Sequence, residues 1–173
     1  ETRFGHQNVL SAVAQSARVR PSQLILEDAT QQKLTYRKLM VGADVMADAL
    51  RGRTAGGERV GVLLPNVNAT PLVILALWRL GKVPAMLNFS SGIATMLACA
   101  NLAGLKHIVT SRAFLERAKL KADDFKKAGL SLIYLEDVRA GISNSRKFLT
   151  LLRHIFLQPS AFSLQPSPTS SAV

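Results

Sequence analysis

The sequence contains no apolar run long enough to cross a bilayer. Its longest uninterrupted apolar run, "LVILALW" from Leu72 to Trp78, falls far short of the roughly 20 residues that a membrane-spanning helix needs. The single cysteine, Cys99, excludes an internal disulfide, and its neighbours "MLACANLAG" predict that it lies on the apolar face of a helix. This low cysteine content suits a reducing compartment and favours a cytoplasmic protein.

Acidic residues are also scarce. The chain has 22 Lys and Arg against 11 Asp and Glu, which gives a formal net charge of +11. Such an excess of positive charge attracts nucleic acid, anionic lipid or an acidic carrier protein, and by itself it does not distinguish between these partners. The bases are scattered in "RVR", "RGR", "KLK" and "FKK", without interleaved aromatics or a zinc or helix-turn-helix pattern. We therefore expect no nucleic-acid partner, and a solvated basic surface is the plain alternative.

No constellation of residues typical of catalysis is present in the sequence. His6, His107 and His154 lie far apart, and none has metal-ligand spacing with another histidine or with Cys99. No nucleophile elbow of the G-x-S-x-G type occurs. The triplet "LED" appears at 26–28 and at 135–137, both times at a predicted strand end, where solvated turn residues are expected. We assign no catalytic residue and no metal ligand.

What the sequence does contain is a regular alternation of short apolar runs with amphipathic stretches. Glycines close several of the helices, and Thr35 and Ser111 are predicted to begin two of them. The pattern predicts an α/β fold with three layers, a mostly parallel sheet with helices on both faces. Strands are predicted at 23–28, 33–36, 59–64, 83–88, 107–111 and 130–137, and helices at 36–50, 68–80, 92–103 and 112–129.

The C-terminal part of the chain changes character twice. The stretch "NSRKFLTLLRHIFL" at 144–157 is amphipathic and basic, which favours either packing on the core or lying on an anionic membrane surface. Residues 158–173 are rich in proline and serine and carry no charge, as linkers do. We therefore divide the chain into an α/β subdomain at 1–157 and a linker at 158–173. The opening "ETRFGHQ" has no leader pattern, and we expect a piece of a longer protein.

Ligands of open α/β sheets bind beyond the carboxyl ends of the strands. The loops predicted there are "LPNVN", "NFSSG" and "TSR", and their candidate substrate contacts are Asn66, Asn88, Ser90 and Ser91. The "NFSSG" loop could offer backbone N–H groups and a helix dipole to an anion. It lacks the lysine of a Walker loop and the three glycines of a dinucleotide loop, so helix capping by Ser90 or Ser91 is the alternative role.

Several segments resemble the N-terminal part of the AMP-forming adenylating enzymes, the acyl-CoA synthetase superfamily. They are "LTYRKL", "GERVGVLLPN", "GKVPAMLNF" and "TSRAF", within a likeness that runs from about Asn8 to Phe156. The last two segments resemble the synthetase portion of enzymes that combine acyl-acyl carrier protein synthetase with 2-acylglycerophosphoethanolamine acyltransferase activity. In this family the "NFSSG" loop is a strand-to-helix connection and not the phosphate loop.

The resemblance implies a fatty acid:acyl carrier protein or CoA ligase linked to lysophospholipid acylation. ATP and Mg²⁺ serve the complete enzyme, and the phosphate loop, the nucleotide-binding segments and the catalytic lysine belong to later motifs that nothing here matches. We therefore expect the chain alone to be inactive, to bind no nucleotide tightly, and to pack against the missing remainder of the adenylating domain. The implied location is the cytoplasm or the inner face of the cell membrane. The alternative is a basic, non-catalytic module that docks on an acidic carrier protein or an anionic membrane.

Overall fold

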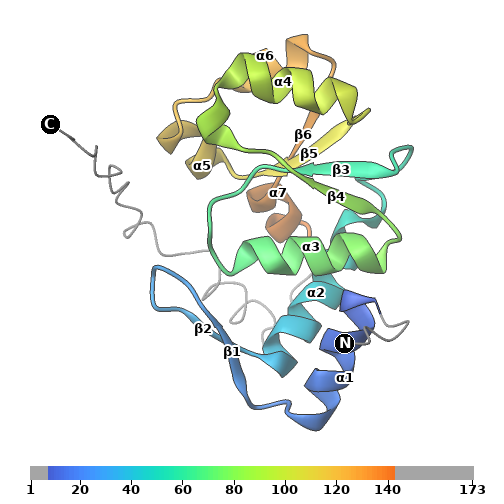
Figure 1. The fold of residues 1–173 in the computed structure, drawn as a ribbon. Coiled ribbons are helices and arrows are strands. Elements are labelled where there is room, and N and C mark those ends of the chain that lie inside the picture. The colour runs from blue at the N-terminus through green and yellow to red at the C-terminus, as the bar shows by residue number, and fades with distance from the viewer. Residues whose placement is uncertain (1–7, 143–173) are drawn as a thin grey trace, which may run out of the picture.

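A computed structural model describes residues 8–142 of the 173-residue chain (Figure 1). The predicted helix at 144–157 and the predicted linker at 158–173 lie outside these residues. The elements, in chain order, are α1 Val9–Val19, β1 Leu24–Glu27, β2 Lys33–Thr35, α2 Tyr36–Arg51, β3 Arg59–Val62, α3 Ala69–Arg79, β4 Val83–Met86, the short 3₁₀ helix η1 Phe89–Ser91, α4 Ile93–Leu102, β5 His107–Thr110, α5 Arg112–Arg117, α6 Ala122–Lys127, β6 Ser131–Tyr134 and α7 Leu135–Ala140.

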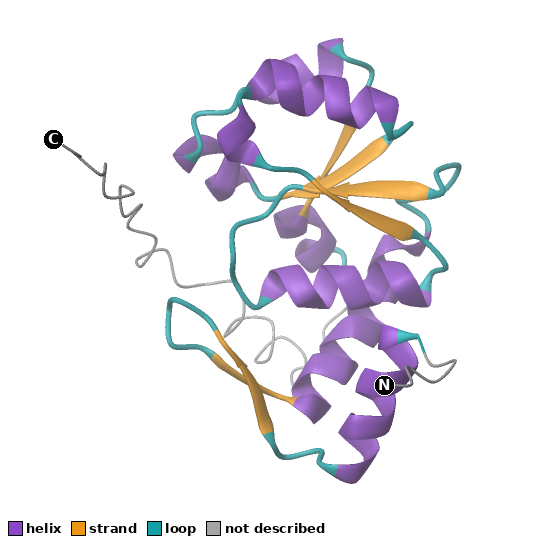
Figure 2. Ribbon diagram, viewed as in Figure 1, coloured by secondary structure: helices purple, strands orange, loops and turns teal. Residues whose placement is uncertain are grey.

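The main sheet has four parallel strands in the order β4-β3-β5-β6. The chain leaves β3 toward one edge to form β4 and then returns past β3 to form β5. Right-handed crossovers therefore place α3, between β3 and β4, on one face, and the helices of the two later crossovers on the other face. In Figures 1 and 2, α4, α5 and α6 cover one face, and α2, α3 and α7 cover the other. The predicted three-layer α/β fold is confirmed.

Each face of the sheet has its own hydrophobic core. Val60 and Val62 of β3 pack with α2 and α3, and the predicted apolar face of α2, with Leu39, Met46 and Leu50, is buried there. On the other face, Ile108 packs with residues of α4, α5 and α6. Strands buried on both sides need continuous apolar runs, which explains why these strands were predictable.

The β1–β2 hairpin stands apart from the main sheet as a two-stranded antiparallel ribbon. Thr35 ends the hairpin and caps α2, because its side chain accepts from the N–H of Lys38 at 3.4 Å. This cap was predicted. Helix α1, capped by Asn8 through the N–H of Ser11 at 2.8 Å, was not predicted. It contacts α2 and α3 but contains no fully buried residue, so its sequence signal is weak.

Three local predictions were wrong. The helix predicted from Ser90 or Ser91 begins later, at Ile93, with Gly92 as its N-cap, and both serines lie in η1. The single helix predicted over 112–129 is split into α5 and α6, because Lys119 adopts a left-handed φ of 54° that interrupts it. The strand predicted at 130–137 ends at Tyr134, and "LED" begins α7.

Cys99 lies on α4 and is exposed. Only Met96 and Ala100 are buried on this largely apolar helix, so the apolar face predicted to hold the cysteine does not bury it. Among residues 8–142, no helix is both long enough and apolar enough to cross a membrane.

Candidate functional site

The three loops predicted to contact ligands, "LPNVN", "NFSSG" and "TSR", follow strands β3, β4 and β5 and therefore lie at the carboxyl edge of the parallel sheet. The chain reverses direction across the sheet between β3 and β5, and the crevice at such a switch point is where ligands of doubly wound folds bind. Thr110, at the end of β5, is fully buried, and its hydroxyl donates to the carbonyl of Leu63 at 2.8 Å. This bond fixes the two strand ends that border the crevice.

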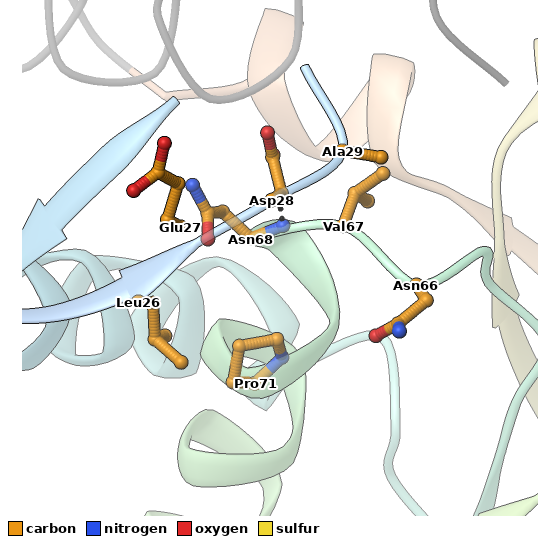
Figure 3. A pocket seen from close by; sticks show the side chains of 8 residues that line it. All are labelled: Leu26, Glu27, Asp28, Ala29, Asn66, Val67, Asn68 and Pro71. Atoms are coloured by element: carbon orange, nitrogen blue, oxygen red, sulfur yellow. Dashed lines mark hydrogen bonds between the residues drawn. The ribbon is translucent and has the colours of Figure 1, made fainter. Parts of the chain in front are cut away.

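A hollow of about 240 Å³ lies beside this edge, between the hairpin and the loop after β3. Its lining comes from two segments, 26–29 and 66–71, as Figure 3 shows: Leu26, Glu27, Asp28, Ala29, Asn66, Val67, Asn68 and Pro71. Asn66, a predicted contact, is exposed here, and its side chain forms no hydrogen bond with residues 8–142. It is free to meet a ligand or a neighbouring layer.

Asp28 joins the two walls of this hollow. Its Oδ1 accepts from the N–H and hydroxyl of Thr30, at 2.9 and 2.6 Å, and from the N–H of Gln32 at 3.1 Å. Its Oδ2 accepts from the N–H of Asn68 at 3.3 Å, across to the other segment (Figure 3). Burial by itself raises the pKa of Asp28, but these hydrogen bonds to the charged form outweigh it and hold the pKa below its ordinary value.

Asn68 completes the connection from its own side. It is only 3% exposed, and its side-chain amide donates to the carbonyl of Gln32 at 2.7 Å. It precedes α3, as predicted, but its side chain makes no cap bond to that helix. Together Asp28 and Asn68 clamp the hairpin to the β3–α3 loop. This role was not predicted from the sequence, which indicated solvated turn residues at 26–28.

The other three predicted contacts lie in a separate loop. Asn88 Oδ1 accepts from the N–H and hydroxyl of Ser90, at 3.0 and 2.8 Å, and the Ser91 hydroxyl donates to the Asn88 carbonyl at 2.8 Å. None of the three lines the hollow beside Asn66. The structure thus places Asn66 with the hairpin and groups Asn88, Ser90 and Ser91 with one another.

Two backbone donors of the loop at 88–92 are already used within it. The N–H of Ser90 is bonded to the Asn88 side chain, and the N–H of Ser91 to the Asn88 carbonyl at 3.3 Å. These two groups are therefore not available to an anion, whereas α4 begins after them, at Ile93. Among residues 8–142, no three His, Cys, Asp or Glu side chains are grouped so that they could hold a metal ion. That no nucleotide or Mg²⁺ binds this chain tightly stays a prediction.

A second polar cluster lies at the ends of β5 and β6. Glu136 Oε1 accepts from the Ser111 hydroxyl and from the Arg112 N–H, both at 2.9 Å. The Arg112 guanidinium lies 4.0 Å from the Tyr134 ring centroid and donates to both carboxylate oxygens of Asp137, at 2.8 and 2.7 Å. The bidentate bond lowers the pKa of Asp137 and raises that of Arg112. The second "LED" is thus a helix start that ties two strand ends together, which corrects its prediction as a solvated turn.

A family model for AMP-binding enzymes matches residues 13–150. The chain belongs to the AMP-binding enzyme family. Two solved structures share its fold. One is o-succinylbenzoate CoA synthetase (MenE) from Bacillus subtilis in complex with the acyl-adenylate OSB-AMP, with a TM-score of 0.65 and 18% identity over 80% of this chain and 34% of that one. The other is the N-terminal subdomain of Klebsiella oxytoca NpsA in complex with 3-hydroxyanthranilyl-AMSN, with a TM-score of 0.66 and 17% identity over 84% and 36%.

The described AMP-binding fold thus spans about a third of each solved relative, 34% of the MenE chain and 36% of the NpsA chain. MenE from Bacillus subtilis has also been solved with ATP and magnesium, at a TM-score of 0.65 and 16% identity over 76% of this chain and 34% of that one. At these identities the likeness to the solved structures supports the fold.

Proposed function

We propose that this chain supplies the first sheet-and-helix unit of an AMP-forming fatty acid ligase. The observation that carries the proposal is the family match over residues 13–150. The exposed position of Asn66, at the carboxyl edge of the parallel sheet, is consistent with it. The segments "GKVPAMLNF" and "TSRAF" support a fatty acid substrate, because they resemble the branch that loads acyl carrier protein.

The proposed reaction has two steps. The carboxylate of a fatty acid attacks the α-phosphorus of ATP, forming the acyl-adenylate and releasing pyrophosphate. The thiol of acyl carrier protein or CoA then attacks the acyl carbon and releases AMP. In the proposed physiological setting the acyl group passes on to a lysophospholipid, at the inner face of the cell membrane.

The described residues supply support for this chemistry and no reacting group. ATP and Mg²⁺ act in the complete enzyme, and we expect no tight binding to this chain because its loop donors are already bonded within the loop. The proposed partner of the carboxyl edge is the remainder of the adenylating domain. Asn66 is the best-placed of the predicted contacts, since the polar groups of Asn88, Ser90 and Ser91 bond to one another.

The test compares the 173-residue chain with the product of its complete reading frame. We expect the longer product to exchange labelled pyrophosphate into ATP only when a fatty acid is present, and the chain alone to show no exchange. Hydroxybenzoate in place of fatty acid is the matched control for substrate class. Exchange by the chain alone would contradict the support role. Exchange that depends on hydroxybenzoate instead of fatty acid would contradict the substrate.

The non-catalytic alternative, a basic module that docks on an acidic carrier protein or an anionic membrane, draws on the net charge of +11. This alternative would be favoured if the complete product showed no fatty acid-dependent exchange of pyrophosphate into ATP but did bind an anionic partner. The distribution of the bases over the fold decides which surface would be used.

A further inference from the structure

Two exposed bases stand side by side at the amino edge of the sheet. Arg59 opens β3 and Lys106 directly precedes β5, and because Val60 lies opposite His107, Arg59 and Lys106 occupy opposite positions on neighbouring strands. Neighbouring strands are about 4.8 Å apart. Neither base forms an ion pair with any residue in the range 8–142. Like charges placed so closely cost stability, so an external counter-charge would relieve them.

Exposed aliphatic side chains flank this pair. Val83 lies opposite Arg59 on β4 and is 46% exposed. Leu102, in the last turn of α4, is 89% exposed, and Figure 1 shows α4 ending on the side of the sheet where β5 begins. Lys127 is an exposed base at the end of α6, four residues before Ser131. The N–H of Ser131 bonds to the Lys106 carbonyl at 2.9 Å, so α6 ends close in the chain to this edge of the sheet.

The face of the sheet on which these residues lie is set by strand alternation. Gly61 packs toward Ile108 and Leu105, on the face covered by α4, α5 and α6, and Arg59 is two residues before it on the same face. Glu58 is the nearest acid along the chain, and alternation directs it to the opposite face. Positive charge on this face is therefore not offset by its sequence neighbour.

We propose that Arg59, Lys106, Lys127, Val83 and Leu102 form a docking surface for an anionic lipid membrane, here termed the basic edge. Bases close to an anionic bilayer gain Coulomb energy from its phosphates, and aliphatic side chains among them enter the boundary between headgroups and acyl chains. The basic edge lies opposite the carboxyl edge, so a bound membrane leaves the candidate site open.

This inference is independent of the proposed adenylation, and its test requires no activity. The full 173-residue chain is sedimented with vesicles of phosphatidylcholine alone or of phosphatidylcholine and phosphatidylglycerol in equal parts. We expect binding only to the anionic vesicles, and we expect salt to weaken it. Replacing Arg59 and Lys106 by Gln together should weaken binding about thirtyfold, since each base near the surface contributes about fivefold.

The matched control replaces Arg37 and Lys38 by Gln. It removes the same charge from the exposed first turn of α2, and binding should stay within about twofold of the unchanged chain. Leu102→Asn should weaken binding about tenfold, and this loss should persist at high salt because it is apolar in origin. All these side chains are exposed, so thermal melting by circular dichroism should show an intact fold in every variant.

Three results would overturn the proposal. The first is equal loss from the two double variants, which would indicate diffuse charge instead of a surface. The second is no binding to the anionic vesicles. The third is binding to polyglutamate that matches vesicle binding and does not respond to Leu102→Asn, which would identify an acidic protein as the partner.

Discussion

The backbone N–H of Asn68 lies 3.3 Å from Oδ2 of Asp28, and this contact joins two segments that are 40 residues apart in the sequence. Together with the bond from the Asn68 side chain to the Gln32 carbonyl, it ties the hairpin turn to the loop between β3 and α3. Because the hollow beside the carboxyl edge is lined by both segments, the contact sets the shape of the candidate site. The stability of this junction is therefore open to direct measurement.

Replacement of Asp28 by Asn should destabilise the fold in a pH-dependent manner. Folding holds the pKa of this carboxyl below its unfolded value, about 3.9, so its contribution is fully present above that pH and is lost as the pH falls through the lower folded pKa. At neutral pH we expect a loss of about 1 kcal/mol in the free energy of unfolding, because the group is only partly shielded from water. Urea denaturation at neutral pH and near pH 3 measures this difference, which should narrow under acid. An equal difference at both pH values would contradict the role of the charge.

Asn68→Ala should cost more than Asn66→Ala. Asn68 is buried, and removal of its side chain leaves the Gln32 carbonyl without its 2.7 Å donor, a loss of about 1–3 kcal/mol. Asn66 is two residues away and exposed, so its replacement should change the free energy of unfolding by less than about 0.5 kcal/mol. Denaturation of the two variants side by side tests the distinction. Equal losses in the free energy of unfolding would mean that the bond from Asn68 to the Gln32 carbonyl makes no specific contribution to stability.

Gly61→Ala tests the closeness of the β3–β5 contact. A Cβ at Gly61 would lie 2.8 Å from Ile108 Cγ1 and 3.1 Å from Leu105 Cδ1, so the buried core would have to shift, at a cost of about 1–3 kcal/mol. Gly52→Ala is the matched control, since nothing lies within 4 Å of its Cβ position and its φ is −75°. That variant should be neutral or more stable by up to about 1 kcal/mol. Thermal melting of both variants distinguishes a steric cost from a general effect of the methyl group.

The sequence predicted the layered architecture because its signals are local. Strands buried on both faces require apolar runs, and helix α2 repeats buried residues at Leu39, Ala43, Met46 and Leu50 with helical spacing. Such patterns can be read within a short window. The two short strands at 23–28 and 33–36 and the Thr35 cap were predicted for the same reason, whereas the antiparallel pairing of these strands apart from the main sheet was not.

The contact between Asp28 and Asn68 and the polar cluster around Glu136 could not be predicted, because the residues that meet are far apart in the sequence. Asp28 meets Asn68 across 40 residues, and Ser111 meets Glu136 across 25. The break at Lys119 carries no glycine to mark its left-handed backbone. The D-x-T spacing of Asp28 and Thr30 is a turn signal that could have indicated a bonded carboxylate, but nothing local identifies its partner in the β3–α3 loop.

The loop at 88–92 offers the last test, which concerns what holds the start of α4 in place. The sequence assigned the cap of this helix to Ser90 or Ser91. In the structure Asn88 caps the preceding short helix η1, and α4 starts after Gly92, whose φ is 81° and which provides no side-chain cap. Asn88→Ala removes the acceptor for both the N–H and the hydroxyl of Ser90 and should lower the free energy of unfolding by about 1 kcal/mol. Ser91→Ala removes only an exposed hydroxyl bond to the Asn88 carbonyl and should cost less than about 0.5 kcal/mol. Amide hydrogen exchange at Ser90 should accelerate in the first variant and stay unchanged in the second, because only Asn88 accepts from that N–H. A larger loss from Ser91→Ala than from Asn88→Ala would restore the serine as the residue that holds this loop.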